Sequence, residues 1–164
     1  MLASKQAFLL PLTPPAPILD EETAVRLRIA VARLSRALRP TSAGQAAGLT
    51  PTRASVLLAI VREGQVGLSA LAASESLNPT MLSRAISALV EAGLVARVSD
   101  DEDRRAAWVK STPAGRKLAE RMRRERTAAL NHGLEGLSRD DRRAIESALP
   151  ALEGLAKQLR DRHP

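Results

Sequence analysis

Residues 78–110 decide the fold, and they read NPTMLSRAISALVEAGLVARVSDDEDRRAAWVK. Asn78-Pro79 predicts the start of a helix, because an Asn side chain accepts from the first free amides and proline fits the first helical position. Gly93 predicts the end of that helix in a left-handed turn. We therefore expect a helix to Ala92, followed by a strand over 94–98, a polar tip over 99–105 and a returning strand over 106–111.

The predicted helix has two unlike faces. Apolar side chains recur at helical spacing on the face that we expect to be buried: Leu82, Ala85, Ile86, Leu89 and Val90. The opposite face carries short hydroxyl groups and one guanidinium: Thr80, Ser83, Arg84 and Ser87. Such side chains suit close approach to base edges and phosphates in the major groove of duplex DNA. A plain solvated surface is the alternative for this helix taken alone, although such surfaces more often carry pairs of Glu and Lys.

The hairpin that follows the helix predicts a wing, as in a winged helix-turn-helix. Arg104 and Arg105 would lie at its tip, where one of them can enter the narrow minor groove and its negative potential. We expect Asp103 to brace one of these arginines. The alternative is that the tip charges only pair with one another in solvent, which adds little stability. The remaining candidates for DNA contacts are Asn78, Arg53 and Arg97.

Before this stretch, the chain is expected to form an arm and three helices. Residues 1–19 contain four prolines and predict a flexible arm. Helices are expected over 20–39, 51–64 and 69–74, with a loop over 40–49. Asp20 and Thr50 are the expected caps of the first two helices.

After the wing, two more helices are expected. Thr112, followed by proline, repeats the same kind of helix start, and Gly133 and Gly136 are expected to break this helix. Ser138 begins a capping box for the last helix, and Pro150 is expected to kink it.

The first helix and the two last helices each have an apolar stripe that a small DNA-reading domain cannot cover. Burial against the same helices of a second copy is the simplest solution, since twofold homodimers are the commonest oligomers. Such a dimer would place two recognition helices about one DNA turn apart, to match a pseudo-palindromic site. The alternative is a helical bundle within one chain.

Composition narrows the classes of function. The chain has 164 residues and a formal charge of +7, which favours a polyanionic partner. With only Phe8 and Trp108 as aromatic residues, it cannot stack a row of single-stranded bases, so duplex DNA is favoured. No apolar run is long enough to span a bilayer. The absence of cysteine excludes disulfides and thiolate sites, and is compatible with the cytoplasm.

Catalysis is not expected from this sequence. His132 and His163 are the only histidines, and neither has a ligand partner at metal spacing. No nucleophile elbow and no glycine-rich phosphate loop is present. We therefore predict no enzyme activity, no metal site and no cofactor.

Several motifs, in this order, resemble the MarR family of winged helix-turn-helix regulators. They are LTP at 49–51, LSALA at 68–72, LVEAGLV at 89–95, DDEDRR at 100–105 and TPAGR at 112–116. The resemblance covers roughly residues 20–160. It implies a mainly α fold with a small β-hairpin wing (α+β), in which a winged helix-turn-helix domain carries N- and C-terminal dimerisation helices. The expected domains are an arm (1–19), a dimerisation helix and loop (20–48), the DNA-binding domain (49–111) and the C-terminal dimerisation helices (112–160).

The resemblance also implies a function. It implies a homodimeric repressor that reads duplex DNA with the helix over 78–92 and the wing over 98–106. It also implies that a small phenolic or lipophilic effector relieves the repression. Three departures stand out: the uncharged start Asn78 to Met81, Ser111 in place of a usual leucine, and Trp108 on the wing strand. The alternative function is a winged-helix module that acts through protein–protein contacts without sequence-specific DNA binding.

Overall fold

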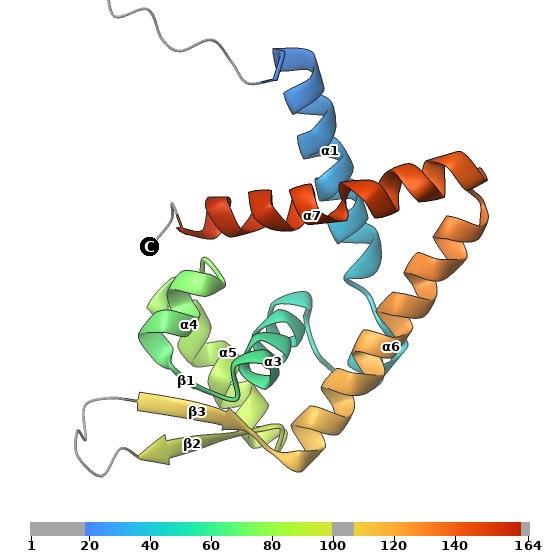
Figure 1. The fold of residues 1–164 in the computed structure, drawn as a ribbon. Coiled ribbons are helices and arrows are strands. Elements are labelled where there is room, and N and C mark those ends of the chain that lie inside the picture. The colour runs from blue at the N-terminus through green and yellow to red at the C-terminus, as the bar shows by residue number, and fades with distance from the viewer. Residues whose placement is uncertain (1–18, 100–106, 162–164) are drawn as a thin grey trace, which may run out of the picture. The chain divides into compact units, whose positions relative to one another are not determined.

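The structure is a computed structural model that describes residues 19–99 and 107–161. It is mainly helical with one small sheet, as expected (Figure 1). In chain order the elements are α1 (Glu21–Leu38), α2 (Ser42–Ala46), α3 (Pro51–Glu63), β1 (Gln65–Gly67), α4 (Leu68–Ser74), α5 (Pro79–Glu91), β2 (Val95–Ser99), β3 (Ala107–Ser111), α6 (Pro113–Glu135) and α7 (Arg139–Asp161). The chain divides into two compact units, Met1–Ser35 and Arg36–Pro164.

The predicted helix starts are confirmed atom by atom. At each of them the cap side chain accepts from the backbone N–H three residues further on. The pairs are Asp20 with Thr23 (2.8 Å), Thr50 with Arg53 (3.3 Å), Asn78 with Met81 (2.8 Å), Thr112 with Gly115 (3.0 Å) and Ser138 with Asp141 (3.0 Å). These starts are legible in the sequence because each bond spans only three residues.

The sheet has three antiparallel strands in the order β1-β3-β2. The two wing strands lie within one residue of their expected positions, and Val98 pairs with Trp108. Strand β1 was not expected: its Val66 pairs with Val109 on the other edge of β3. A strand of three residues has too little pattern to be recognised, and only its pairing with a distant strand defines it.

An aliphatic core holds these elements together. The largest fully buried side chains come from five helices and strands: Leu57, Ile60, Leu71, Ile86, Leu89, Met122, Val56 and Val109. Of the departures seen in the sequence, Ser111 is buried at the end of β3, where its carbonyl oxygen accepts from Arg116 Nη1 at 3.0 Å.

The expectation of a loop over 40–49 was wrong, because this stretch contains α2. Thr41 caps this helix by accepting from Gly44 N at 3.1 Å. Both oxygens of the Glu125 carboxylate, from α6, accept from Ala43 N at 3.1 and 3.2 Å. A helix of five residues is marginal by itself, and a carboxylate 82 residues away stabilises it by accepting from the Ala43 amide.

The expectation that Gly133 breaks the helix that begins after Thr112 was also wrong. Helix α6 runs on to Glu135, and only Gly136 stands at its end. Glycine costs a solvated helix about 1 kcal/mol relative to alanine, which a helix of 23 residues tolerates. Pro150 lies inside α7, which continues on both sides of it.

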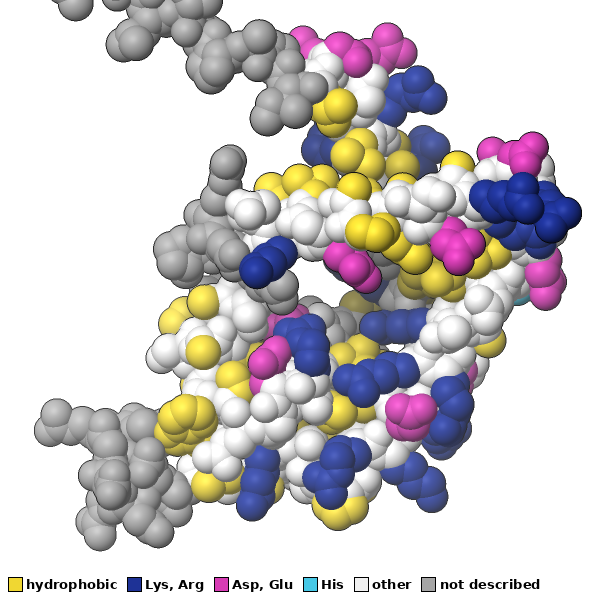
Figure 2. Space-filling model, viewed as in Figure 1, with side chains coloured by type: hydrophobic (Ala, Val, Ile, Leu, Met, Phe, Trp, Pro, Cys, Tyr) yellow, Lys and Arg dark blue, Asp and Glu magenta, His cyan; other side chains and the backbone are white. Residues whose placement is uncertain are grey.

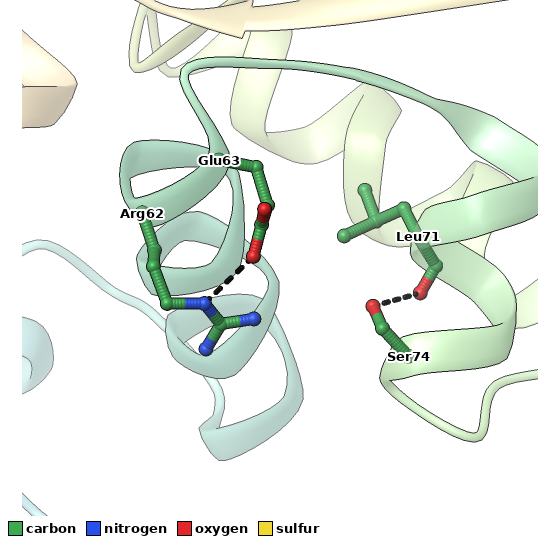
Figure 3. A network of polar contacts seen from close by, with 4 residues as sticks. All are labelled: Arg62, Glu63, Leu71 and Ser74. Atoms are coloured by element: carbon green, nitrogen blue, oxygen red, sulfur yellow. Dashed lines mark hydrogen bonds and ion pairs between the residues drawn. The ribbon is translucent and has the colours of Figure 1, made fainter. Parts of the chain in front are cut away.

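Surface ion pairs contribute little to this fold. In Figure 3, Arg62 Nε at the end of α3 donates to Glu63 Oε1 at 2.8 Å, and both side chains are exposed. Nearby, Ser74 Oγ donates to the Leu71 carbonyl oxygen at 3.1 Å, and the same oxygen accepts from Glu75 N at 3.1 Å at the end of α4. Exposed pairs such as Arg62 with Glu63 add about 0–1 kcal/mol, so the core is the main source of stability.

Candidate nucleic-acid interface

Helix α5 is held by one face only. As expected, Leu82, Ala85, Ile86 and Leu89 are buried, and Val90 is partly buried against the same core. The helix packs against α3, α4 and β2. Because α5 contacts two helices and one strand, its orientation is fixed. The face of α5 that points away from these neighbours is exposed to solvent.

The exposed face of α5 holds the candidates for base contacts. Thr80, Ser83 and Arg84 are exposed, while Ser87 is half-buried. No described carboxylate pairs with Arg84. This guanidinium is therefore able to donate to an anionic or carbonyl acceptor on a partner.

Asn78 already has a structural role, because its Oδ1 caps α5. An Asn side chain has two further N–H donors on its amide nitrogen. Capping and a contact to a phosphate are therefore compatible for this residue.

The other predicted site residues lie on separate elements. Arg53 is half-buried in the first turn of α3, and Arg97 is exposed on β2. Asp103, Arg104 and Arg105 lie outside the described residues, so the predicted wing-tip contacts remain predictions.

The wing strands are tied to the helices around α5. Trp108 on β3 faces Gly67, which precedes α4: a Cβ at position 67 would lie 3.9–4.0 Å from the indole ring. The Trp108 Nε1 atom is buried and has no hydrogen-bond partner among the described residues. The Trp108 indole ring thus makes mainly apolar contacts, and it packs against Gly67, where β1 ends and α4 begins.

Two features of this region were missed in the sequence, one on the α5 surface and one buried at the joint between α6 and β2. Met81, in the first turn of α5, has a side chain that is 48% exposed. Gly115 in α6 lies so close to the carbonyl group of Leu94 that a Cβ would overlap it. Gly115 belongs to the TPAGR motif, so the sequence contained a signal for it. The hydrophobic pattern of the sequence gave no indication that Met81 would be exposed.

The comparisons with known proteins agree with this geometry. The family model of the MarR family matches residues 49–107. An uncharacterised HTH-type transcriptional regulator of Mycobacterium bovis is 31% identical over 139 residues, which cover 85% of this chain and 96% of that protein. The chain belongs to the MarR family. It is a winged-helix transcriptional regulator of that family.

Solved structures of MarR-like proteins share the fold. A transcriptional regulator from Pseudomonas aeruginosa is 29% identical, with a TM-score of 0.69 over 86% of this chain and 99% of that one. NadR, solved in complex with 4-hydroxyphenylacetate, is 23% identical, with a TM-score of 0.61 over 85% of this chain and 97% of that one. The family match begins just before α3 and ends at the first residue of β3, so it includes α5 and its supports.

A pair of arginines lies apart from α5 in this MarR-family chain. Arg126 Nη2 on α6 donates to the Arg39 carbonyl oxygen at 3.2 Å. Burial lowers the pKa of Arg126, and the positive charge of Arg39 lowers it further. The Arg126 Nε atom is buried without a partner among the described residues. Within the described part of the chain, no carboxylate forms an ion pair with either guanidinium.

The described residues also bear on metal binding and on membrane insertion. Within them, no group of three His, Asp or Glu side chains is placed to hold a metal ion. No helix in the same ranges has the length and apolar content that crossing a membrane requires.

Proposed function

We propose that this regulator is a repressor that binds a pseudo-palindromic duplex operator as a homodimer. The single observation that carries the proposal is the exposed face of α5, which is polar and uncommitted while the other face is fixed in the core. A helix held in this way presents its side chains to the major groove without reorganisation. Because such a regulator binds chromosomal DNA, we also propose that it is located in the cytoplasm.

The proposed contacts follow the position of each side chain. In the major groove, α5 would contact bases and phosphates through Thr80, Ser83, Arg84, Ser87 and the Asn78 amide. The wing would contact the minor groove through Arg104 or Arg105, braced by Asp103. Arg53 and Arg97 would contact phosphates, since each lies on an element next to α5.

The proposed dimer is supported by the terminal helices. Large apolar side chains are exposed along α1 and α7, including Val31, Leu34, Leu149 and Leu159. Figure 2 shows hydrophobic atoms in yellow along both helices. Exposed apolar rows of this length are unusual on a monomer, and a second copy would cover them. The proposed domain division, with dimerisation segments over 20–48 and 112–160, rests on the same exposure.

We also propose relief of repression by a small phenolic or lipophilic effector. NadR, which has the same fold, was solved with 4-hydroxyphenylacetate. In the present chain, Arg126 Nε has no partner among the described residues, and the positive charge of Arg39 lies close to it, which suits an acidic group on such a molecule. Isothermal titration with 4-hydroxyphenylacetate would test this, and Arg126→Ala should abolish any binding detected.

An electrophoretic shift titration over salt tests DNA binding. We expect the logarithm of the affinity to fall by about 0.9 per log unit of salt for each phosphate contact. Arg84→Ala should weaken operator binding by about tenfold or more, because a base contact is lost in each half-site. Arg143→Ala removes the same charge from α7, on the side away from its apolar stripe and outside the proposed DNA contacts, and should have little effect.

Two outcomes would contradict this proposal. One is equal affinity of the Arg84→Ala and Arg143→Ala variants for the operator. The other is absence of binding to any duplex together with stoichiometric capture of a protein partner. The second outcome would favour the alternative of a module for protein–protein contacts.

A further inference from the structure

Met81 is the feature of the α5 surface that the proposed contacts leave unexplained. Its side chain is large, apolar and 48% exposed. All other large exposed apolar side chains in the described ranges lie between Leu19 and Leu34 or between Leu130 and Leu159. Those belong to the terminal segments, where a second copy would cover them. Within the described part of 36–129, Met81 is therefore alone in its exposure.

The structure also fixes where Met81 lies. It is the third residue of α5, and its backbone N–H donates to the Asn78 cap at 2.8 Å. Arg84 follows three residues later and is thus its neighbour on the helix surface. Recognition helices contact base edges with their N-terminal residues. Met81 therefore lies at the end of α5 that meets the bases, beside the one arginine of that face.

We propose that Met81 reads the C5-methyl group of a thymine in each operator half-site. The inference rests on the proposed function and deepens it by naming a base. Among the distinguishing groups in the major groove, the thymine methyl is apolar, and the others are hydrogen-bond donors or acceptors. Methionine has no strong donor or acceptor to offer them, but its flexible, polarisable side chain packs well against a methyl group.

The test begins with a selection that needs no known operator. The full-length protein selects bound duplexes from a random-sequence library. Each thymine of the selected sequence is then replaced in turn by deoxyuridine, which removes the methyl group and keeps the base pair. We expect one thymine in each half-site at which this replacement weakens wild-type binding by about fourfold, the effect of removing one apolar carbon from a contact.

Variants separate a contact to Met81 from an effect of the methyl group on the DNA itself. In Met81→Ala the preference for thymine over deoxyuridine should disappear, and in Met81→Leu it should persist. Ser83→Ala, altered on the same exposed face, should weaken binding yet keep the preference. This comparison is a double-mutant cycle between one side chain and one methyl group.

The outcomes distinguish the inference from the function on which it rests. If Met81→Ala keeps the full preference for thymine, or the wild type has none, the inference is overturned while DNA binding stands. If the library yields no bound duplex at all, the proposed function fails and the inference fails with it.

Discussion

Gly115 shows how one absent side chain sets the joint between α6 and the wing. A Cβ at this position would overlap the Leu94 carbonyl oxygen, lie 3.0 Å from the carbonyl carbon and lie 3.4 Å from Leu57 Cδ1. Thr112 holds the same joint, because its Oγ1 donates to the Gly93 carbonyl oxygen at 2.7 Å and its N–H donates to Leu94 O at 3.1 Å. The helix and the strand can approach this closely because residue 115 is glycine.

We expect Gly115→Ala to lower the free energy of unfolding by about 3 kcal/mol, because the added methyl group meets backbone that cannot move aside. Urea unfolding at one fixed protein concentration would measure the change. Gly133→Ala is the matched control in the same helix: nothing lies within 4 Å of its Cβ, and alanine should raise stability by about 0.5–1 kcal/mol. Equal effects of the two variants would refute this account of the joint.

At the scale of elements, the helix starts are set by side chains close in sequence. Asp20 is the example with a measurable charge: its Oδ1 accepts from Thr23 N at 2.8 Å at the start of α1. This hydrogen bond from the Thr23 backbone is the largest cause that lowers the pKa of Asp20 below its usual range. The carboxylate also lies at the positive end of the α1 dipole, next to Glu21 and Glu22.

The pH dependence of this cap follows from the lowered pKa. A group whose pKa is lower in the folded state stabilises that state above its ordinary pKa, and the stabilisation is lost as the pH falls through the folded pKa. We expect NMR titration of the Asp20 carboxyl carbon to give a midpoint below that of an unstructured aspartate. Asp20→Asn should keep α1 capped at acid pH, since an uncharged amide also caps. A midpoint at the ordinary value would mean that the cap is not formed in solution.

At the scale of the molecule, α7 carries an apolar face that no other described part of the chain covers. Five of its side chains are large, apolar and exposed: Ile145, Leu149, Leu152, Leu155 and Leu159. With 3.6 residues per turn they fall on one stripe, so they act as a surface rather than as scattered residues. If this stripe forms the proposed dimer, stability and DNA binding will both depend on protein concentration.

We expect Leu152→Glu to convert the protein to monomers in sedimentation experiments and to weaken operator binding, since a charge would be buried in the proposed interface. Ser147→Glu introduces the same charge on the side of α7 away from the apolar stripe and should leave the dimer intact. Dimers of unchanged stability in Leu152→Glu would place the interface elsewhere.

Whether a structural feature of this protein can be predicted from the sequence depends on how far apart along the chain the interacting residues lie. The caps at Asp20, Thr50, Asn78 and Thr112 were legible because donor and acceptor lie three residues apart. The inward face of α5 was legible for the same reason, since helical periodicity is local. The polar face of α5, as a candidate site, followed directly from it.

The sequence by itself therefore determined the capped starts of α1, α3, α5, α6 and α7, the two faces of α5, the wing strands and, through the order of the motifs, the family. Only the tertiary structure decided the rest. Strand β1 exists because it pairs with β3, the Ala43 amide of α2 donates to Glu125 from α6, and Gly115 is required because the Leu94 carbonyl group approaches it. The physical reason is distance along the chain. Local hydrogen bonds and helical periodicity depend on residues only a few positions apart. Strand pairing, hydrogen bonds between distant residues and close backbone approach depend on segments that meet only after folding.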